Sequence, residues 1–402
     1  MTGDGRSSPS QLRSAPVEGT VVPRWVTWTA VGLAVSCALA VGGVLIAGAG
    51  ESAAPATQGR HGLPPATGPG AADVSTHTSA THRSPLERLI RPAAPYLGIS
   101  LPEGPRDLAA VDLLGQLAGH RPNLLEYFEP WTEPINLEWA RATWAAGLLP
   151  LLTWEPWDPW NRGPDGTPRF DQPDYTLAML SSGRYDAYIR TQAIALRDLG
   201  TPVALRFAHE MNGYWYPWGV ATQGAGNSAA AYVRAWRHVW QIFHDAGAAN
   251  VIWVWSVNVV SGAPRVPLAS VYPGDRYVDW VGLSGYLDNA VTSFEAEYAD
   301  TLAQLRRFAG DKPWLIAETG ASASDPATRA AEIDSLFTGI RDNPEFIGLV
   351  WFDHATPKAD WRFENHPTTL EAFRSQVAAG GFGTLPVPKP TATGPPTRVS
   401  AP

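Results

Sequence analysis

Two glutamates follow apolar runs of the sequence, where a carboxylate must either pair with a cation or take part in chemistry. Glu210 ends the segment "PVALRFAHE", which starts at Pro202, and Glu318 stands near the end of "PWLIAETG", which starts at Pro313. Burying a carboxylate without a partner is strongly unfavourable. A structural salt bridge explains one such glutamate as well as catalysis does. Two of them, each after an apolar run, favour a catalytic pair.

Two carboxylates that face each other across a substrate suit the hydrolysis of a glycosidic bond. One protonates the leaving oxygen, and the other attacks the anomeric carbon or activates water; carboxyl groups about 5–5.5 Å apart give retention and wider gaps give inversion. The sequence does not supply this distance. Arg206 lies four residues before Glu210 and on the same face of a strand. A cation there keeps a neighbouring carboxylate ionised, as a nucleophile requires.

Further polar residues stand beside this pair. Tyr286 ends the apolar run before that of Glu318, and its hydroxyl can donate a hydrogen bond to the Glu318 carboxylate. His209 and Asn212 flank Glu210 and are expected to tune it or to bind sugar hydroxyls. Polar residues expected either to bind sugar or to serve as structural partners are Glu155, Asp158, Asp353 and His354.

Tryptophan is abundant, with 18 residues in a chain of 402. Indole rings stack on the apolar faces of pyranose rings, although any single tryptophan is equally well explained by packing. Tryptophans on helical patterns, expected to be packing residues, are Trp139, Trp144, Trp236 and Trp240. Those expected to line a sugar-binding cleft are Trp131, Trp154, Trp157, Trp160, Trp215, Trp218, Trp351 and Trp361.

The elements that carry these residues alternate between short apolar runs and helical patterns. Eight strand candidates start at Tyr96, Leu124, Leu148, Pro202, Val251, Val278, Pro313 and Phe346, with helical patterns such as 229–246, 294–308 and 326–340 between them. This rhythm predicts an α/β fold, a (β/α)8 TIM barrel, whose active site lies at the carboxyl ends of the strands. A doubly wound open sheet is the alternative, but no glycine-rich phosphate loop follows the first strand.

The composition excludes several classes of function. The formal net charge of -8 argues against a protein that binds nucleic acid through its phosphates. A single cysteine, Cys37, excludes an internal disulfide and a cysteine-rich metal site. We therefore expect no nucleic-acid partner, and we expect the protein to be monomeric.

The ends of the chain differ from its middle. Residues 1–24 are polar and contain arginines, and residues 25–50 carry no charge, which predicts a transmembrane signal anchor or a signal peptide with its N-terminus in the cytoplasm. Residues 51–92 predict a disordered Pro/Ala/Thr-rich linker, 93–380 the catalytic domain and 381–402 a Pro-rich disordered tail. The catalytic domain is thus expected outside the cytoplasm, anchored to the cell membrane or secreted after cleavage.

Several motifs in the middle region resemble glycoside hydrolase family 26, within the large clan of retaining barrel glycosidases. They are "RFAHEMNGYWYPWG" from Arg206, "KPWLIAETG" from Lys312, "GLSGY" from Gly282 and "GLVWFD" from Gly348. The resemblance covers about residues 93–380. It implies that Glu210, after strand four, is the general acid/base and that Glu318, after strand seven, is the nucleophile. It also implies an aromatic platform at Trp351 beneath the sugar, and no metal or organic cofactor.

The resemblance implies an endo-acting enzyme for a β-linked polysaccharide, with β-1,4-mannan as the first expectation. Strand three ends here in "TWEPWDP", where many mannanases of the family carry a histidine, and this departure raises an endo-β-1,3-1,4-glucanase as an alternative. A xylanase is a further alternative on the same fold. A non-catalytic glycan-binding or polysaccharide-assembly protein is the alternative from another class. It predicts binding without hydrolysis.

Overall fold

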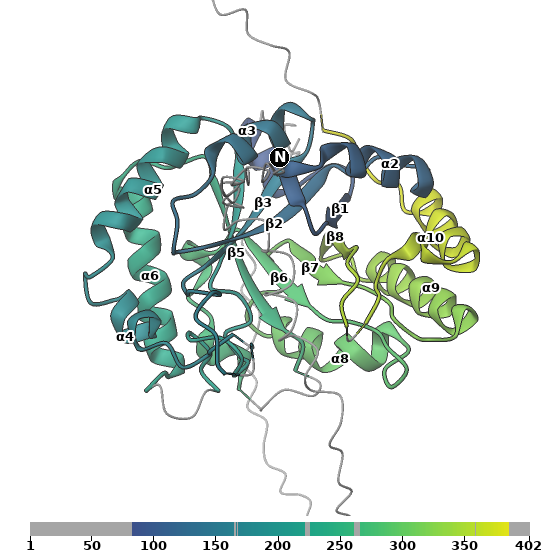
Figure 1. Ribbon diagram of the computed structural model, residues 1–402. Coiled ribbons are helices and arrows are strands. Elements are labelled where there is room, and N and C mark those ends of the chain that lie inside the picture. Colours follow the sequence, from purple (N-terminus) through teal and green to yellow (C-terminus); the bar gives the residue numbers. More distant parts are fainter. Residues whose placement is uncertain are drawn as a thin grey trace, which may run out of the picture.

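Eight parallel strands close into a barrel in the strand order β1 to β8 (Figure 1). The computed structural model describes residues 83–385, except 165, 167, 222–225, 261–265 and 358. The strands are β1 (Tyr96–Ser100), β2 (Leu124–Pro130), β3 (Leu149–Glu155), β4 (Val203–Phe207), β5 (Val251–Asn258), β6 (Trp280–Ser284), β7 (Trp314–Thr319) and β8 (Phe346–Phe352). All eight predicted runs form strands, so the barrel is confirmed and the open sheet is excluded.

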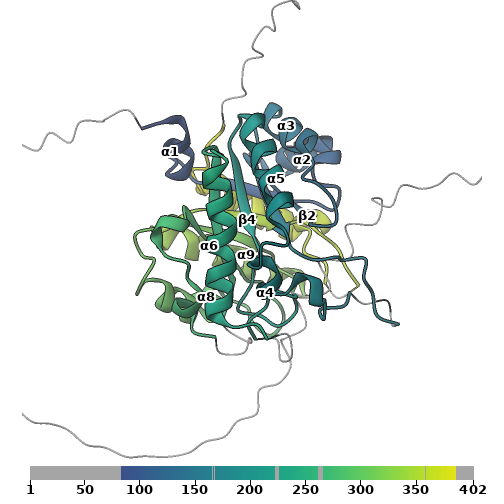
Figure 2. The same ribbon diagram turned by 90° about the vertical axis from the view of Figure 1, so that its left-hand side faces the viewer.

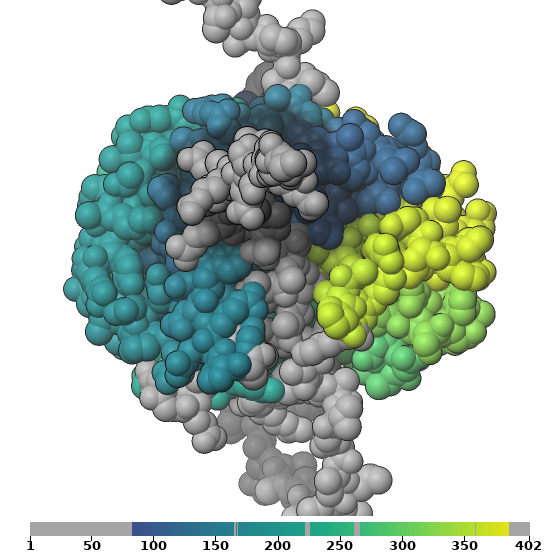
Figure 3. Space-filling view, in the orientation of Figure 1, coloured from purple at the N-terminus to yellow at the C-terminus, as the bar shows by residue number. Residues whose placement is uncertain are grey.

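Helices surround the barrel on its outer face (Figures 1 and 2). In the space-filling view, the teal segments of α5 and α6 lie on the opposite flank from the yellow-green segments of α9 and α10 (Figure 3). The α-helices of the described residues are α1 (Pro85–Ile90), α2 (Leu108–Ala118), α3 (Leu137–Ala145), α4 (Leu177–Leu180), α5 (Asp186–Leu199), α6 (Ala229–Asp245), α7 (Leu268–Val271), α8 (Phe294–Leu305), α9 (Pro326–Asp342) and α10 (Pro367–Ala379).

Local sequence signals set the starts of the long helices. Ser228 precedes α6, and its hydroxyl accepts a hydrogen bond from the backbone N–H of Ala231. Asp325 caps α9 in the same way, with Pro326 at the first helical position. Such caps satisfy N–H groups that have no partner within the helix. The helix boundaries expected from the sequence are therefore met closely.

The interior of the barrel is apolar towards one end and polar towards the other. The apolar layer, formed by inward side chains, contains Tyr96, Leu124, Leu149, Leu151, Ala204, Ile252, Val254, Trp280, Leu315, Ala317 and Val350. Side chains alternate along a strand, so the next inward positions lie two residues further on. Those positions are polar on four strands, at Glu126, Thr153, Arg206 and Ser256, and on β6 the polar residue is Ser284, one inward position further on after Gly282. A fully buried polar layer therefore lies just below the carboxyl ends of the strands.

Helix α1 packs on the opposite, amino-terminal end of the barrel. Leu86, Leu89 and Ile90 contact the apolar layer, and the Trp280 indole N–H donates to the backbone carbonyl of Ile90 at 2.9 Å. The final part of the predicted linker 51–92 is therefore a helix that belongs to the folded domain. None of the helices in the described residues is long and apolar enough to cross a membrane. The predicted span 25–50 lies outside the described residues.

Candidate active site

A strained turn after β4 presents Glu210. Ala208 and Glu210 have φ angles of 43° and 53°. Among the described residues, these are the two non-glycine residues with a positive φ. Such a backbone conformation costs about 1–3 kcal/mol per residue and persists only where the surroundings enforce it. Here the Glu210 N–H donates to the Ser256 carbonyl at 2.8 Å, and the Trp218 indole N–H donates to the His209 carbonyl at 2.6 Å. The turn thus fixes the carboxylate over the barrel.

A bulge in β7 turns Glu318 inward. Between Ile316 and Thr319, β7 advances three residues while its neighbour β8 advances two, from Leu349 to Trp351. An extra residue of this kind changes the face on which the following side chains lie. Strict alternation after the inward Ala317 would send Glu318 outward. The bulge instead brings its carboxylate to Arg206, inside the barrel.

The two carboxylates lie close enough for a retaining mechanism. One oxygen of Glu210 and one of Glu318 are within 4.8 Å of each other. The carboxyl groups of retaining glycosidases stand about 5–5.5 Å apart, and those of inverting ones about 6.5–9.5 Å. Burial raises the pKa of Glu210 to about 7, and the negative charge of Glu318 adds to this rise while Arg206 opposes it. Glu210 is therefore suited to act as a general acid near neutral pH.

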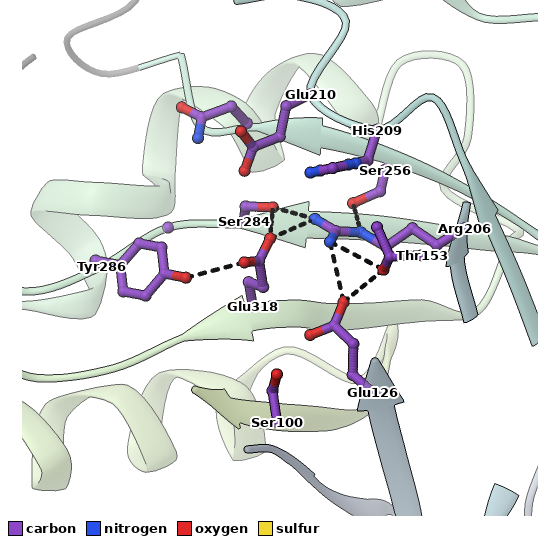
Figure 4. Close-up of polar contacts among 12 residues, drawn as sticks. Ser100, Glu126, Thr153, Arg206, His209, Glu210, Ser256, Ser284, Tyr286 and Glu318 are labelled. Carbon is purple, nitrogen blue, oxygen red and sulfur yellow. Dashed lines mark hydrogen bonds and ion pairs between the residues drawn. The ribbon is translucent and has the colours of Figure 1, made fainter. Parts of the chain in front are cut away.

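Arg206 lies at the centre of the polar layer and binds Glu318 directly (Figure 4). Its Nη2 donates to Glu318 Oε1 at 2.8 Å and to Ser284 Oγ at 2.5 Å. Its Nε donates to Ser256 Oγ at 3.0 Å. Burial opposes the charge of this guanidinium, but the carboxylates around it raise its pKa above the usual range. The Glu318 carboxylate is thus held by a permanent cation.

Tyr286 holds the other oxygen of Glu318. Its hydroxyl donates to Glu318 Oε2 at 3.1 Å, and Ser284 Oγ donates to Oε1 at 3.3 Å. Each carboxylate oxygen therefore accepts at least one hydrogen bond, which fixes its orientation. The structure brings Arg206 and Tyr286 to Glu318 as the sequence predicts.

Trp215 binds Glu210 rather than presenting an open stacking face. Its fully buried indole donates an N–H to Glu210 Oε2 at 2.7 Å. This hydrogen bond favours the ionised carboxylate and lowers the pKa of Glu210, against the larger effect of burial. Glu210 Oε1 has no partner among the described residues. That oxygen is free to carry the proton that catalysis needs.

His209 is a neutral, buried neighbour of both carboxylates. Burial lowers its pKa well below the usual range. Its Nε2 lies 3.1 Å from the Tyr216 hydroxyl, and the Tyr216 ring stacks on Trp218 with centroids 4.3 Å apart. Trp218 thus packs on Tyr216, which in turn contacts His209. Ligand atoms of His209, Glu210 and Glu318 lie within 4.8 Å of one another. Among the described residues, this group could hold a metal ion. Such an ion would share the Glu318 carboxylate with the Arg206 guanidinium.

Glu155 ends β3 and faces the same end of the barrel. Its Oε2 accepts a hydrogen bond from the Trp157 indole at 3.2 Å, and its Oε1 has no partner among the described residues. Burial raises the pKa of Glu155 to about 8, and the charge of Glu318 contributes to this rise. Glu155 is thus a neutral acid at pH 7, able to donate a hydrogen bond. Trp157 is fully buried and supports it.

Two predicted sugar-binding tryptophans point away from the site. Trp154 follows the inward Thr153 and packs between β3 and the helices, with Tyr188 and Phe243 beside its ring. Trp351 follows the inward Val350 and packs against Phe373 of α10. Both predictions are wrong because adjacent residues of a strand face opposite sides.

Trp361, in the loop after β8, is 2% exposed and packs beside Tyr286. Its ring centroid lies 5.2 Å from that of Tyr286, and its Nε1 has no partner among the described residues. The Trp351 indole N–H donates to the Trp361 carbonyl at 2.9 Å, so Trp351 helps to hold the loop that carries Trp361. The aromatic residue nearest the nucleophile's tyrosine therefore comes from the loop after β8, not from the strand.

Other predicted polar residues serve the structure. The Asn212 side chain donates to the Asn258 carbonyl and accepts from the Asn258 N–H, at 2.7 and 2.9 Å, so both ends of its amide tie the β4 loop to β5. The Asp353 carboxylate accepts from the Phe363 N–H. His354 Nε2 lies 3.2 Å from Ser100 Oγ. Asn212 therefore holds the β4 loop against β5.

The sequence reasoning missed the rest of the polar layer. Glu126 accepts hydrogen bonds from Arg206 and Thr153, and Ser256 and Ser284 accept from Arg206. Glu126 stands in the run "LLEYFEP", where a glutamate among apolar residues was the available signal. It was missed because it lies inside a strand rather than at its end.

A cavity of about 360 Å³ opens where β2 ends, beside α3. Phe128 lies between this cavity and the catalytic residues, since its ring centroid is 6.3 Å from that of His209. The volume is in the range of small-ligand pockets. The lining residues are Arg106, Phe128, Glu129, Pro130, Glu133, Pro134, Asn136 and Trp139.

Comparison with known proteins gives matches in one family. Residues 171–320 match the model described as Glycosyl hydrolase family 26. Endoglucanase H of Acetivibrio thermocellus is 30% identical over 282 residues, which cover 68% of this chain and 29% of that protein. Mannan endo-1,4-beta-mannosidase A and B of Caldalkalibacillus mannanilyticus is 38% identical over 128 residues, which cover 31% of this chain and 23% of that protein. Beta-1,3-xylanase TXYA of a Vibrio species is 37% identical over 208 residues, which cover 46% of this chain and 42% of that protein.

The matched region is thus well under half the length of each of these relatives. Solved structures are similar in fold. A β-mannanase from a symbiotic protist of the termite Reticulitermes speratus has a TM-score of 0.51 and 23% identity over 72% of this chain and 88% of that one. The catalytic domain of a Bacillus sp. JAMB-750 endo-β-1,4-mannanase has a TM-score of 0.55 and 18% identity over 71% of this chain and 86% of that one. At these identities the structures show the barrel fold alone.

Proposed function

The resemblance of this chain to glycosyl hydrolase family 26 is confirmed, and we propose that the protein is a retaining, endo-acting glycoside hydrolase for a β-linked polysaccharide. The observation that carries this proposal is the pair of buried carboxylates, Glu210 and Glu318, with oxygens within 4.8 Å of each other. One of them has its pKa raised to about 7. The other is bound to a guanidinium.

The reaction uses the two carboxylates in turn. Protonated Glu210 gives its proton to the glycosidic oxygen while a Glu318 oxygen attacks the anomeric carbon, so that the glycosidic C–O bond breaks and a covalent glycosyl-enzyme forms. Glu210, now ionised, takes a proton from water, and the resulting hydroxide oxygen displaces Glu318 from the anomeric carbon. Two inversions at one carbon give net retention. Tyr286 and Arg206 keep the Glu318 carboxylate aligned for both steps.

The first substrate candidate is β-1,4-mannan. Its support is the similarity to the mannan endo-1,4-β-mannosidase of C. mannanilyticus. We place Glu155 next to the sugar at the cleavage point, where, as a neutral acid, it donates a hydrogen bond to a sugar hydroxyl. Trp361 is 2% exposed and packs beside Tyr286, so it keeps that tyrosine in place.

An endo-β-glucanase is the second candidate. Endoglucanase H matches 68% of this chain, a larger share than the mannanase does. Strand β3 also ends in Glu155, within the segment "TWEPWDP", which lacks the histidine that many mannanases of the family carry in this region. A glucan and a mannan differ in the configuration of one hydroxyl group per sugar. A hydrogen-bonding residue at this strand end is therefore suited to distinguish them.

We further propose that the barrel acts outside the cytoplasm as a monomer, attached to the membrane through residues 25–50 or released by cleavage. The support is the uncharged run of those residues, preceded by arginines. The substrate is a neutral polysaccharide, and neither nucleic acid nor a cofactor takes part.

The test is a product profile on mannan, mixed-linkage β-glucan and xylan, with wild type and Glu318→Ala side by side. We expect wild type to release oligosaccharides from one of these polymers, and nuclear magnetic resonance to show the β-anomer of the new reducing end first. Initial release of the α-anomer would overturn retention. Hydrolysis by Glu318→Ala at the wild-type rate would exclude Glu318 as the nucleophile. Binding of a polymer without hydrolysis by wild type would favour the non-catalytic alternative.

A further inference from the structure

The polar layer contains a carboxylate that the proposed reaction leaves unused, Glu126 of β2. It is fully buried. Its Oε1 accepts hydrogen bonds from Thr153 Oγ1 at 2.8 Å and from Arg206 Nη1 at 3.0 Å, as Figure 4 shows. Its Oε2 has no partner among the described residues. A buried carboxylate with one oxygen unsatisfied is unfavourable for stability, so it calls for a functional reason.

Arg206 connects this carboxylate to the nucleophile. One amino group of its guanidinium, Nη1, donates to Glu126, and the other, Nη2, donates to Glu318 at 2.8 Å. The Nε atom donates to Ser256. Because all three nitrogens are bound on different sides, the guanidinium is fixed between two carboxylates. Its charge is therefore shared by both.

The first step of the proposed reaction changes this balance of charge. A Glu318 oxygen bonds to the anomeric carbon, the glycosidic C–O bond breaks, and the leaving oxygen takes the proton of Glu210. Glu318 is then a neutral ester, and the negative charge has passed to Glu210. Arg206 remains charged and fully buried, but it has lost the carboxylate that was bound to its Nη2. Loss of a directly bound counter-ion destabilises a buried guanidinium.

We propose that Glu126 is a positioning residue that serves as the counter-ion of Arg206 while Glu318 carries the sugar. This inference rests on the proposed function. Burial raises the pKa of Glu126, Arg206 lowers it, and the charge of Glu318 raises it again. Formation of the ester removes the charge of Glu318, so the carboxylate form of Glu126 is favoured most at the stage when Arg206 needs it. The support acts on the first step, because the second step returns a charge to Glu318.

The test compares Glu126→Gln with Glu129→Gln. Glutamine keeps an oxygen that accepts from Arg206 and Thr153 but cannot carry the negative charge. Glu129 is the matched control because it is a buried carboxylate of the same strand whose pKa burial raises to about 8, yet it accepts its hydrogen bond from the Asn136 N–H. An aryl glycoside of the sugar released by wild type separates the steps, since the burst of phenol reports the first step and the steady state reports the second.

We expect Glu126→Gln to slow the burst and to lower kcat/KM by about tenfold or more, with the second step at its wild-type rate. Glu126→Asp, which keeps the charge, should recover part of the loss, and Glu129→Gln should behave as wild type. A 2-fluoro glycoside that labels Glu318 should react more slowly with Glu126→Gln in mass spectra. Thermal unfolding of each variant reports the fold.

Three outcomes overturn the counter-ion role while wild type remains active. They are a wild-type burst in Glu126→Gln, an equal slowing of both steps, and failure of both Glu126 variants to fold, which would assign the residue to the architecture. A wild type that hydrolyses none of the polymers overturns the proposed function itself. The two failures are therefore distinguishable.

Discussion

Replacing Trp215 with phenylalanine removes one hydrogen bond from the acid/base and keeps an aromatic ring in its place. In the structure the Trp215 indole donates to Glu210 Oε2 at 2.7 Å. This bond favours the carboxylate and lowers the pKa of Glu210, although burial leaves that pKa raised to about 7. Without the donor, Glu210 keeps its proton to a higher pH. The alkaline limb of the activity profile, where the acid is lost, should therefore move upward.

The magnitude follows from the strength of a hydrogen bond to a charged group, about 1.5–3 kcal/mol. Since 1.36 kcal/mol corresponds to a tenfold change in the ionisation constant, the limb should move by about one to two pH units. The assay is kcat/KM against pH on a soluble polysaccharide, because this ratio reports the free enzyme. A substrate with a leaving group that needs no proton should show little alkaline limb in either enzyme.

Trp218→Phe is the matched control for this experiment. Its indole lies in the same loop and is equally buried, but it donates to the backbone carbonyl of His209 rather than to a carboxylate. Its loss should lower stability without moving the alkaline limb upward. The reasoning fails if the limb of Trp215→Phe stays in place or moves to lower pH. It also fails if Trp218→Phe moves the limb upward by the same amount.

Four further substitutions test other parts of the site. Tyr286→Phe removes the 3.1 Å hydrogen bond to Glu318 Oε2 and should lower kcat about tenfold with thermal stability nearly unchanged; wild-type kinetics would exclude this role. Glu155→Gln should gain stability relative to wild type as the pH rises from about 5 to about 9. The raised pKa of about 8 means that the unfolded state ionises first, so folded wild type loses stability over that window. Chemical unfolding measures the stability difference between the two proteins, and a difference that does not change with pH contradicts the prediction. Trp361→Ala and Trp351→Ala each remove a buried indole and should each lower the free energy of unfolding by about 3–5 kcal/mol, which chemical unfolding measures. Only Trp361 packs on Tyr286, so only Trp361→Ala should also lower kcat, and an equal effect of both variants on kcat would contradict this role.

The sequence alone determined the barrel and its two principal carboxylates. All eight apolar runs form strands because each is short and apolar, and most are separated from the next by a helical pattern. In a parallel barrel the carboxyl ends of all strands meet at one end. Glu210 and Glu318 stand at the ends of the fourth and seventh runs. Their meeting follows from counting strands.

The sequence also predicted that Arg206 and Tyr286 lie beside the catalytic carboxylates. Arg206 stands four residues before Glu210, and Tyr286 ends the run before that of Glu318. Tyr286 follows β6, the neighbour of β7, whereas Arg206 of β4 reaches Glu318 across the interior of the barrel. The structure places both within hydrogen-bonding distance of the Glu318 carboxylate.

The direction of each side chain was decided only by the tertiary structure. The strands of this barrel are buried on both faces, so their sequences show no contrast between an inner and an outer side. Trp351 and Phe352 are both aromatic, yet the first packs outward against α10 and the second lies beside Tyr286. The bulge that turns Glu318 inward comes from the register of β7 against β8. Register depends on how distant segments pack, which no local pattern records.

The same reason explains the polar layer. Glu126 and Glu318 lie 192 positions apart in the chain, and each looks like an isolated glutamate in an apolar run. Only the closed barrel brings both to one guanidinium, at 3.0 and 2.8 Å. The sequence by itself determined which residues are chemically competent and at which end of the barrel they gather. The tertiary structure decided which of them face one another, because inward or outward orientation depends on strand register and barrel closure.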